Sequence, residues 1–144
     1  MKQVEWERFP LFADLSRKDL NLLNDLVEEQ LLRAGEILCL EGSEGDGALL
    51  LVDGALDCSR EGLGDLGRID APAALGMASL ALTTNREASL KAATPARVLL
   101  LTRPAFHRFA QDAPAAAVRV LEGVVRDLAG AMHGGIEALL PPRG

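Results

Sequence analysis

The spacing of apolar residues predicts a helix near the N-terminus. Leucine and valine recur three or four positions apart, as on one face of a helix, at Leu20, Leu23, Leu26 and Val27. Ser16 precedes them as a candidate N-cap, and Asp19 lies in the first turn, where the helix dipole favours a carboxylate. We therefore expect a helix from Ser16 to about Leu32, within an N-terminal helical part of about residues 9–33.

From about residue 34 to residue 102 the helical spacing gives way to short apolar runs separated by Gly, Asp and Pro. Such runs are typical of strands in a sandwich, a barrel or a roll. Asp53-Gly54 separates the second and third runs and predicts a two-residue β-hairpin, in which both turn residues adopt positive φ. The expected strands are 36–40, 48–52, 55–60, 66–69, 88–92 and 97–102.

The last third returns to helical spacing. Pro104 is typical of a helix start, and Asp112 and Pro114 open a long helix to about Leu140, with Gly134-Gly135 a candidate break or bend. The long helix carries an apolar seam at alternating steps of three and four: Val118, Leu121, Val125, Leu128 and Met132. The seam fits a coiled coil between subunits and packing on the chain's own strands equally well.

The composition of the chain limits the number of domains and the kinds of partner that we expect. A chain of 144 residues with 49% apolar content is enough for one core, so we expect a single domain over residues 1–144. The net charge of −6 would repel nucleic-acid phosphates and anionic membranes, and four Phe, one Trp and no Tyr offer few surfaces for stacking bases. No apolar run approaches the ~20 residues of a membrane span, and no signal-peptide core is present. We expect a cytoplasmic protein that binds neither nucleic acid nor membranes.

The sequence contains few residues that could bind a metal or catalyse a reaction. Cys39 and Cys58 are too few for a four-thiolate metal site and lie in strand-like runs, so buried free thiols are expected rather than a disulfide or a metal site. His107 and His133 lie in predicted helices without a cysteine or carboxylate cluster nearby. We therefore expect no catalytic residues and no enzyme activity.

The order of elements and the turn residues suggest a family. Residues 41–47 read Glu-Gly-Ser-Glu-Gly-Asp-Gly, residues 52–56 read Val-Asp-Gly-Ala-Leu, and Gly42, Gly45 and Gly47 are expected at positive φ in a tight turn. Together with residues 15–20, 34–38, 99–101 and 104–106, these motifs resemble the cyclic nucleotide-binding domain family over about residues 9–130. The resemblance implies an α+β fold: an antiparallel β-roll of the jelly-roll (double-stranded β-helix) type over residues 34–102, between an N-terminal helix and C-terminal helices over about residues 104–140.

In this family a phosphate-binding cassette holds the ligand, and residues 75–89 correspond to it. The resemblance assigns Gly76 to the start of a short helix facing the cyclic phosphate and Arg86 to pairing with the phosphate oxygens. Met77 stands where the family has a glutamate that accepts a hydrogen bond from the ribose. Without that hydrogen bond, the binding free energy of the ligand is expected to be weaker by about 1.5–3 kcal/mol. Glu87 follows the arginine where a small residue is usual; it would repel the phosphate if it pointed inward, whereas strand alternation could turn it outward. The expected ligand-binding residues are Gly76, Met77, Ala78, Arg86, Glu87 and Ala88, with weaker candidates in Ser79, Thr83 and Thr84.

Two functions fit these residues. The first is a regulatory sensor that binds a small anionic, nucleotide-like ligand weakly or atypically, with cyclic AMP and cyclic GMP as candidates, and signals through its C-terminal helix. Leu121, Val125 and Leu128 are the expected contacts of a homodimer. The alternative is a ligand-free protein-interaction module with a decayed pocket. Many relatives carry a helix-turn-helix domain after the long helix; this chain ends at Gly144, so direct DNA binding is not expected.

Overall fold

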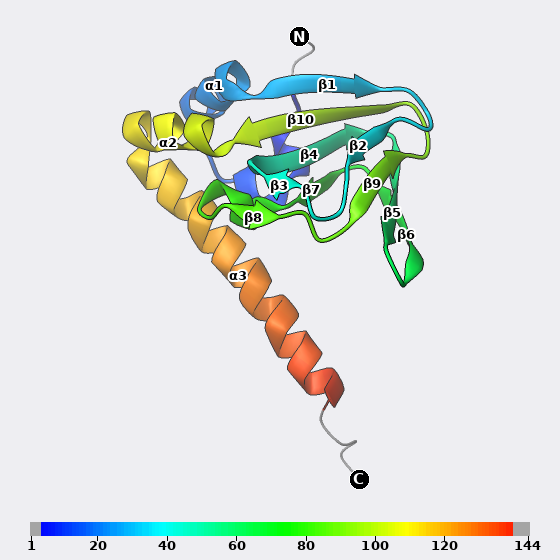
Figure 1. Ribbon diagram of the computed structural model, residues 1–144. Coiled ribbons are helices and arrows are strands. Elements are labelled where there is room, and N and C mark those ends of the chain that lie inside the picture. Colours follow the sequence, from blue (N-terminus) through cyan, green and yellow to red (C-terminus); the bar gives the residue numbers. More distant parts are fainter. Residues whose placement is uncertain (1–3, 140–144) are drawn as a thin grey trace.

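The strands form two four-stranded antiparallel sheets in the computed structural model, which describes residues 4–139 (Figure 1). One sheet has the order β1 (Glu28–Leu32), β10 (Ala96–Thr102), β4 (Gly47–Asp53), β7 (Ala73–Leu75). The other has the order β2 (Ile37–Cys39), β9 (Ser89–Ala92), β5 (Ala55–Arg60), β6 (Gly64–Asp70), and the short strands β3 (Glu44–Gly45) and β8 (Thr84–Asn85) pair separately. The predicted α+β architecture, an antiparallel β-roll with flanking helices, is confirmed.

The helices lie outside the roll. They are α1 (Arg17–Leu26), α2 (Arg103–Asp112) and α3 (Pro114–Leu139), with 3-10 turns η1 (Trp6–Arg8), η2 (Pro10–Phe12) and η3 (Met77–Leu80). Ser16 accepts a hydrogen bond from the Asp19 amide and so caps α1 as expected. Thr102 caps α2 in the same way, and Pro104 lies in the first turn of that helix.

Strand β4 separates two apolar layers. Ala48, Leu50 and Val52 belong to a core cluster with residues of the helices, whereas Leu49 and Leu51 belong to a second cluster inside the roll. Alternate side chains of a strand point to opposite faces, so a strand covered on both faces is apolar at almost every position. The continuous run from Ala48 to Val52 is therefore the signature of a central strand, and it places Leu49 in the interior of the roll.

The N-terminal helix is shorter than its apolar spacing predicts. Helix α1 ends at Leu26, and Val27 has an extended backbone with ψ 148°. Residues 28–32 form β1, which pairs with β10, and the Arg97 guanidinium donates to Glu29 at 2.6 Å across this pair. The predicted continuation to Leu32 is wrong because pairing with β10 outweighs local helical spacing.

The predicted hairpin at Asp53-Gly54 is also wrong. Gly54 does adopt a positive φ of 91°, but Asp53 does not, and no residue other than glycine has a positive φ in the described part of the chain. Strand β4 pairs with β10 and β7, whereas β5 pairs with β6 and β9, so the turn carries the chain from one sheet to the other. A side chain at Gly54 would overlap the Pro95 carbonyl, which explains why the crossing needs a glycine.

The six expected strands are present with ends shifted by at most two residues, and β1, β3, β7 and β8 are additional. The additional strands are at most five residues long, which leaves little periodicity to detect.

Helix α3 runs without interruption through Gly134-Gly135 to Leu139, so these glycines do not break it. Leu140, the expected helix end, lies outside the described residues.

The apolar seam of α3 does not pack on the roll as a whole. Ala116, Ala117, Val120 and Val124 are the buried apolar side chains of the helix, and the first three join the core cluster. Leu121 is half-buried, whereas the rest of the seam is exposed: Val118, Val125, Leu128 and Met132. From residue 125 onward the described side chains of α3 are exposed, and Figure 1 shows this part of the helix projecting away from the roll.

Candidate functional site

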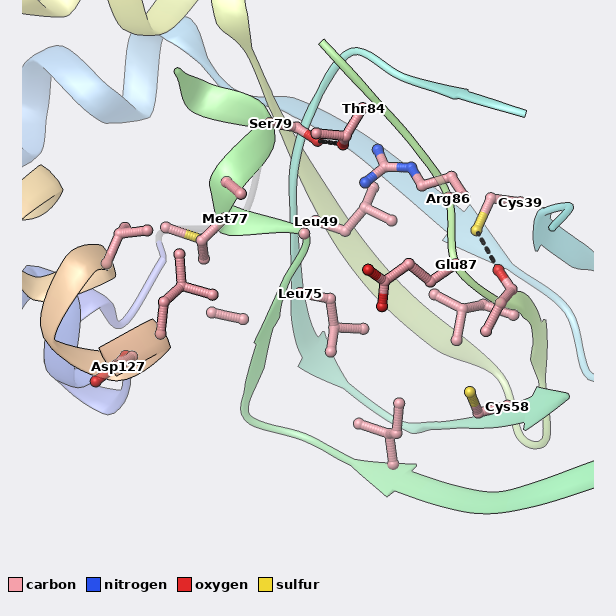
Figure 2. Close-up of a pocket in the computed structure, with 18 of the residues that line it drawn as sticks. Cys39, Leu49, Cys58, Leu75, Met77, Ser79, Thr84, Arg86, Glu87 and Asp127 are labelled. Carbon is pink, nitrogen blue, oxygen red and sulfur yellow. Dashed lines mark hydrogen bonds between the residues drawn. The ribbon is translucent and has the colours of Figure 1, made fainter. Parts of the chain in front are cut away.

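A cavity of about 500 Å³ lies inside the roll, a volume within the usual range for small-molecule sites. Strand side chains form an apolar wall, η3 and the chain from Thr84 to Ala88 form a more polar one, and α3 borders the cavity on another side (Figure 2). All six expected ligand-binding residues line it: Gly76, Met77, Ala78, Arg86, Glu87 and Ala88. The structure thus brings together the residues that the sequence singled out.

Gly76 forms the turn that leads from β7 into η3. Its φ of 64° and ψ of 31° are left-handed, a conformation that costs residues with a Cβ roughly 1–2 kcal/mol. A Cβ added there would also overlap Nη1 of Arg86. Gly76 therefore favours the turn and leaves room for the close approach of the arginine.

The Arg86 guanidinium lies in a slot between glycines. Its Nη2 donates to the Gly47 carbonyl at 2.9 Å, Gly76 lies against Nη1, and a Cβ at Gly45 would be 3.2 Å from Cζ. The Arg86 backbone is fixed as well: its amide donates to Ser43, and its carbonyl accepts from Gly42. The glycine-rich turn at residues 42–47 thus shapes the site by holding this arginine.

The expected positive φ in that turn holds only for Gly42, at 82°. Gly45 and Gly47 lie in strands β3 and β4 and do not have positive φ. Their need for glycine is steric, because a Cβ at Gly47 would overlap the Leu101 carbonyl. The expectation was wrong for these two because strand pairing extends into the turn.

Glu87 points into the cavity. Figure 2 shows its carboxylate between Leu49 and Leu75, on the interior side of the chain. The segment between β8 and β9 is bent, so neighbouring side chains do not alternate between faces there, and Arg86 and Glu87 line the same cavity. The structure thereby decides the orientation that the sequence left open.

Met77 lines the cavity at its α3 side. Figure 2 shows its side chain directed toward α3 and away from Arg86, and it packs against the core cluster shared with the helices. Val124, Asp127 and Leu128 of α3 line the same cavity. Apart from Leu128, these α3 residues carried no sequence signal, because which face of α3 meets the roll depends on tertiary packing.

Of the hydroxyl candidates, two line the cavity and one does not. Ser79 and Thr84 are hydrogen-bonded to each other at 2.8 Å between their hydroxyl oxygens, and Ser79 is buried. Thr83 accepts a hydrogen bond from Arg103 at 2.7 Å and lies outside the cavity lining. Ser79 and Thr84 already partner one another, so they support the wall behind the arginine.

Cys39 and Cys58 are free thiols that line the cavity, and both are half-buried rather than fully buried as predicted. Both pair with Leu90 from opposite sides of β9, so their Cα atoms are two strand spacings apart, roughly 9–10 Å and too far for a disulfide. Burial raises the pKa of the Cys39 thiol, and the charge of Arg86 opposes this in part. Their place in the cavity wall was not foreseen, since adjacent strands in the sheet are not adjacent in the sequence.

Among the side chains that the structure describes, no group of three or more His, Cys, Asp or Glu could hold a metal ion. No helix in the described part of the chain combines the length and apolar character needed to cross a bilayer.

The antiparallel roll, its internal cavity and the bordering C-terminal helix define a small β-roll domain with flanking helices. The family model described as "Cyclic nucleotide-binding domain" matches residues 29–113, more than half of the chain. The chain therefore belongs to the cyclic nucleotide-binding domain family, whose domains are regulatory rather than catalytic.

Individual relatives agree with this assignment. The cGMP-dependent protein kinase egl-4 of Caenorhabditis briggsae is 30% identical over 97 residues, which are 67% of this chain and 13% of the kinase. The N-terminal domain of a transcriptional regulator from Streptomyces coelicolor A3(2) has a TM-score of 0.80 and 25% identity, covering 89% of this chain and 92% of that chain. The catabolite activator protein of Thermus thermophilus has a TM-score of 0.76 and 22% identity, covering 90% and 62%, and is similar in fold.

Proposed function

We propose that this protein is a regulatory sensor domain that binds a small anionic, nucleotide-like ligand in its cavity, weakly or atypically. The observation that carries the proposal is the Arg86 guanidinium, held in a glycine slot at the wall of a cavity of about 500 Å³. A guanidinium presents five N–H donors, and the bond to Gly47 occupies one of them. The remaining donors are suited to the oxygens of a phosphate or a carboxylate.

The family membership makes cyclic AMP and cyclic GMP the first ligands to test, and Met77 argues that they bind weakly. Met77 stands at the position that the family resemblance assigns to the ribose-binding glutamate, and a thioether is only a weak acceptor. Its side chain is directed toward α3 (Figure 2). A ligand that needs an acceptor at this position loses about 1.5–3 kcal/mol, or about ten- to a hundredfold in affinity.

The ligand signal would pass through α3, which borders the cavity and carries an exposed apolar stripe. Val118, Val125, Met132 and Leu139 are exposed and lie seven residues apart, and Leu121 and Leu128 occupy the intermediate positions. This is the a/d pattern of a coiled coil. We propose that two copies pair through this stripe. Leu128 belongs to both the stripe and the cavity lining, which would couple ligand binding to subunit contact.

The protein would act in the cytoplasm without contacting nucleic acid or membranes. The net charge of −6 supports the absence of such contacts, because it opposes binding to both kinds of polyanionic surface.

A ligand-free interaction module is the alternative, and Met77 and Glu87 favour it. In that function the cavity is vestigial and the exposed stripe of α3 is the active surface. The two functions differ in whether Arg86 contributes to binding of a small molecule.

Isothermal titration with cyclic AMP and cyclic GMP tests the proposal. We expect binding that weakens at least tenfold in Arg86→Ala, because a charge-assisted hydrogen bond contributes about 1.5–3 kcal/mol. Arg33→Ala is the matched control, since Arg33 is exposed on the turn before β2 and does not line the cavity. Met77→Glu should strengthen binding about tenfold or more. Absence of binding in both the wild type and Met77→Glu would favour the ligand-free module.

A further inference from the structure

The Glu87 carboxylate faces the cavity without a protein partner. Among the residues that the structure describes, no hydrogen bond or ion pair engages this carboxylate, and the arginine beside it donates to Gly47 instead. An ionised carboxylate is an acceptor only, with about four lone-pair sites. Glu87 is exposed, so water satisfies its carboxylate until a ligand donor replaces that water on the cavity side.

The cavity thus presents opposite charges from neighbouring residues. Arg86 and Glu87 line it together because the chain is bent there, and Figure 2 shows the Glu87 carboxylate between the apolar side chains of Leu49 and Leu75, with the Arg86 guanidinium beyond Leu49. An anion drawn to Arg86 is repelled by the like charge of Glu87 in the same cavity. A ligand that carries only negative charge is poorly matched to this arrangement.

We propose that Glu87 sets the ligand class of the cavity: a small zwitterion with an anionic group for Arg86 and an ammonium or other cationic N–H donor for Glu87. The apolar wall of Leu49 and Leu75 would hold the body of the molecule. The inference rests on the proposed function, namely that the cavity binds a ligand through Arg86. It adds that Glu87 selects against ligands that lack a cation, including cyclic nucleotides.

Glu87→Gln tests this selection with cyclic AMP as the probe. The substitution keeps the size of the side chain and removes its charge, so cyclic AMP should bind about tenfold more tightly than to the wild type. Glu61→Gln is the matched control, because Glu61 is exposed on the turn between β5 and β6 and does not line the cavity. It removes the same charge from the whole protein and should leave the affinity unchanged.

A second probe should respond in the opposite direction. A cyclic AMP analogue with a primary ammonium on a flexible alkyl chain keeps the anionic group and adds the cation. It should bind the wild type more tightly than cyclic AMP does, and Glu87→Gln should abolish that advantage. A general loosening of the cavity would change both affinities in the same direction.

The outcomes separate this inference from the proposed function. Equal affinities of wild type and Glu87→Gln for both probes, with binding still lost in Arg86→Ala, would overturn the role of Glu87 and leave the anion site intact. No binding of either probe to the wild type, to Glu87→Gln or to Met77→Glu would overturn both. Opposite responses of the two probes to Glu87→Gln would support the inference.

Discussion

The position of the Arg86 side chain depends on neighbouring residues that have no side chain. Gly45 and Gly76 lie against its guanidinium, and the carbonyl of Gly47 accepts its hydrogen bond. The backbone bonds to Gly42 and Ser43 hold the arginine at the edge of the roll. A preoriented guanidinium loses less conformational entropy when a ligand binds.

Gly76→Ala should weaken both folding and ligand binding. The left-handed backbone at Gly76 would cost about 1–2 kcal/mol of unfolding free energy, and the new Cβ would displace Nη1 of Arg86. Gly62→Ala is a close control, because Gly62 also has a positive φ, of 82°, but has open space around its Cβ position. Urea denaturation should show similar losses for both variants, and titration with cyclic AMP should show a loss for Gly76→Ala alone. Unchanged affinity in Gly76→Ala would mean that the slot does not position Arg86.

At this scale the sequence predicted which residues meet but not how they are oriented. Gly76 and Arg86 could be found because the family pattern fixes their separation, and all six expected residues line one cavity. The orientation of Glu87 depends on a bend between two strands that strand alternation does not describe. The thiols of Cys39 and Cys58 reach the same cavity only because β9 pairs between their strands.

Apolar spacing correctly predicted the helices and strands that are long. It gave wrong predictions where strand pairing determines the structure of a segment. Strand β5 has the predicted bounds, 55–60, because its run ends in clear turn residues. Residues 28–32 continue the composition of α1 but pair with β10, and the turn at Asp53-Gly54 has a hairpin sequence although its strands enter different sheets. Local sequence specifies a turn, whereas the partners of a strand are set by the whole roll.

Helix α3 is the element from which we predict self-association. Val125→Glu places a charge in the exposed stripe and should shift the protein from dimer to monomer, because like charges would face each other across the pair. Sedimentation velocity over a range of concentrations measures the change. Arg126→Glu introduces the same side chain at an exposed neighbouring position outside the stripe and should leave the dimer in place. A wild-type protein that is monomeric at all concentrations would contradict the pairing of α3.

In the whole molecule, the cavity and the exposed stripe share one helix. The N-terminal half of α3 is anchored by Ala116, Val120 and Val124, whereas the C-terminal half projects from the body (Figure 1). A ligand that contacts Val124, Asp127 and Leu128 acts where the anchored half meets the projecting half. Under the proposed function, a ligand in the cavity would alter the direction of the projecting half, which is the part proposed to contact a second subunit.

The most direct test of the central claim is a crystal structure of the Met77→Glu variant grown with cyclic AMP. We predict electron density for the cyclic phosphate in the cavity, beside Gly76 and within hydrogen-bonding distance of the Arg86 guanidinium, with α3 closing over the ligand. A cavity that contains only water at saturating cyclic AMP, or a phosphate bound away from Arg86, would contradict the claim that this arginine forms an anion site.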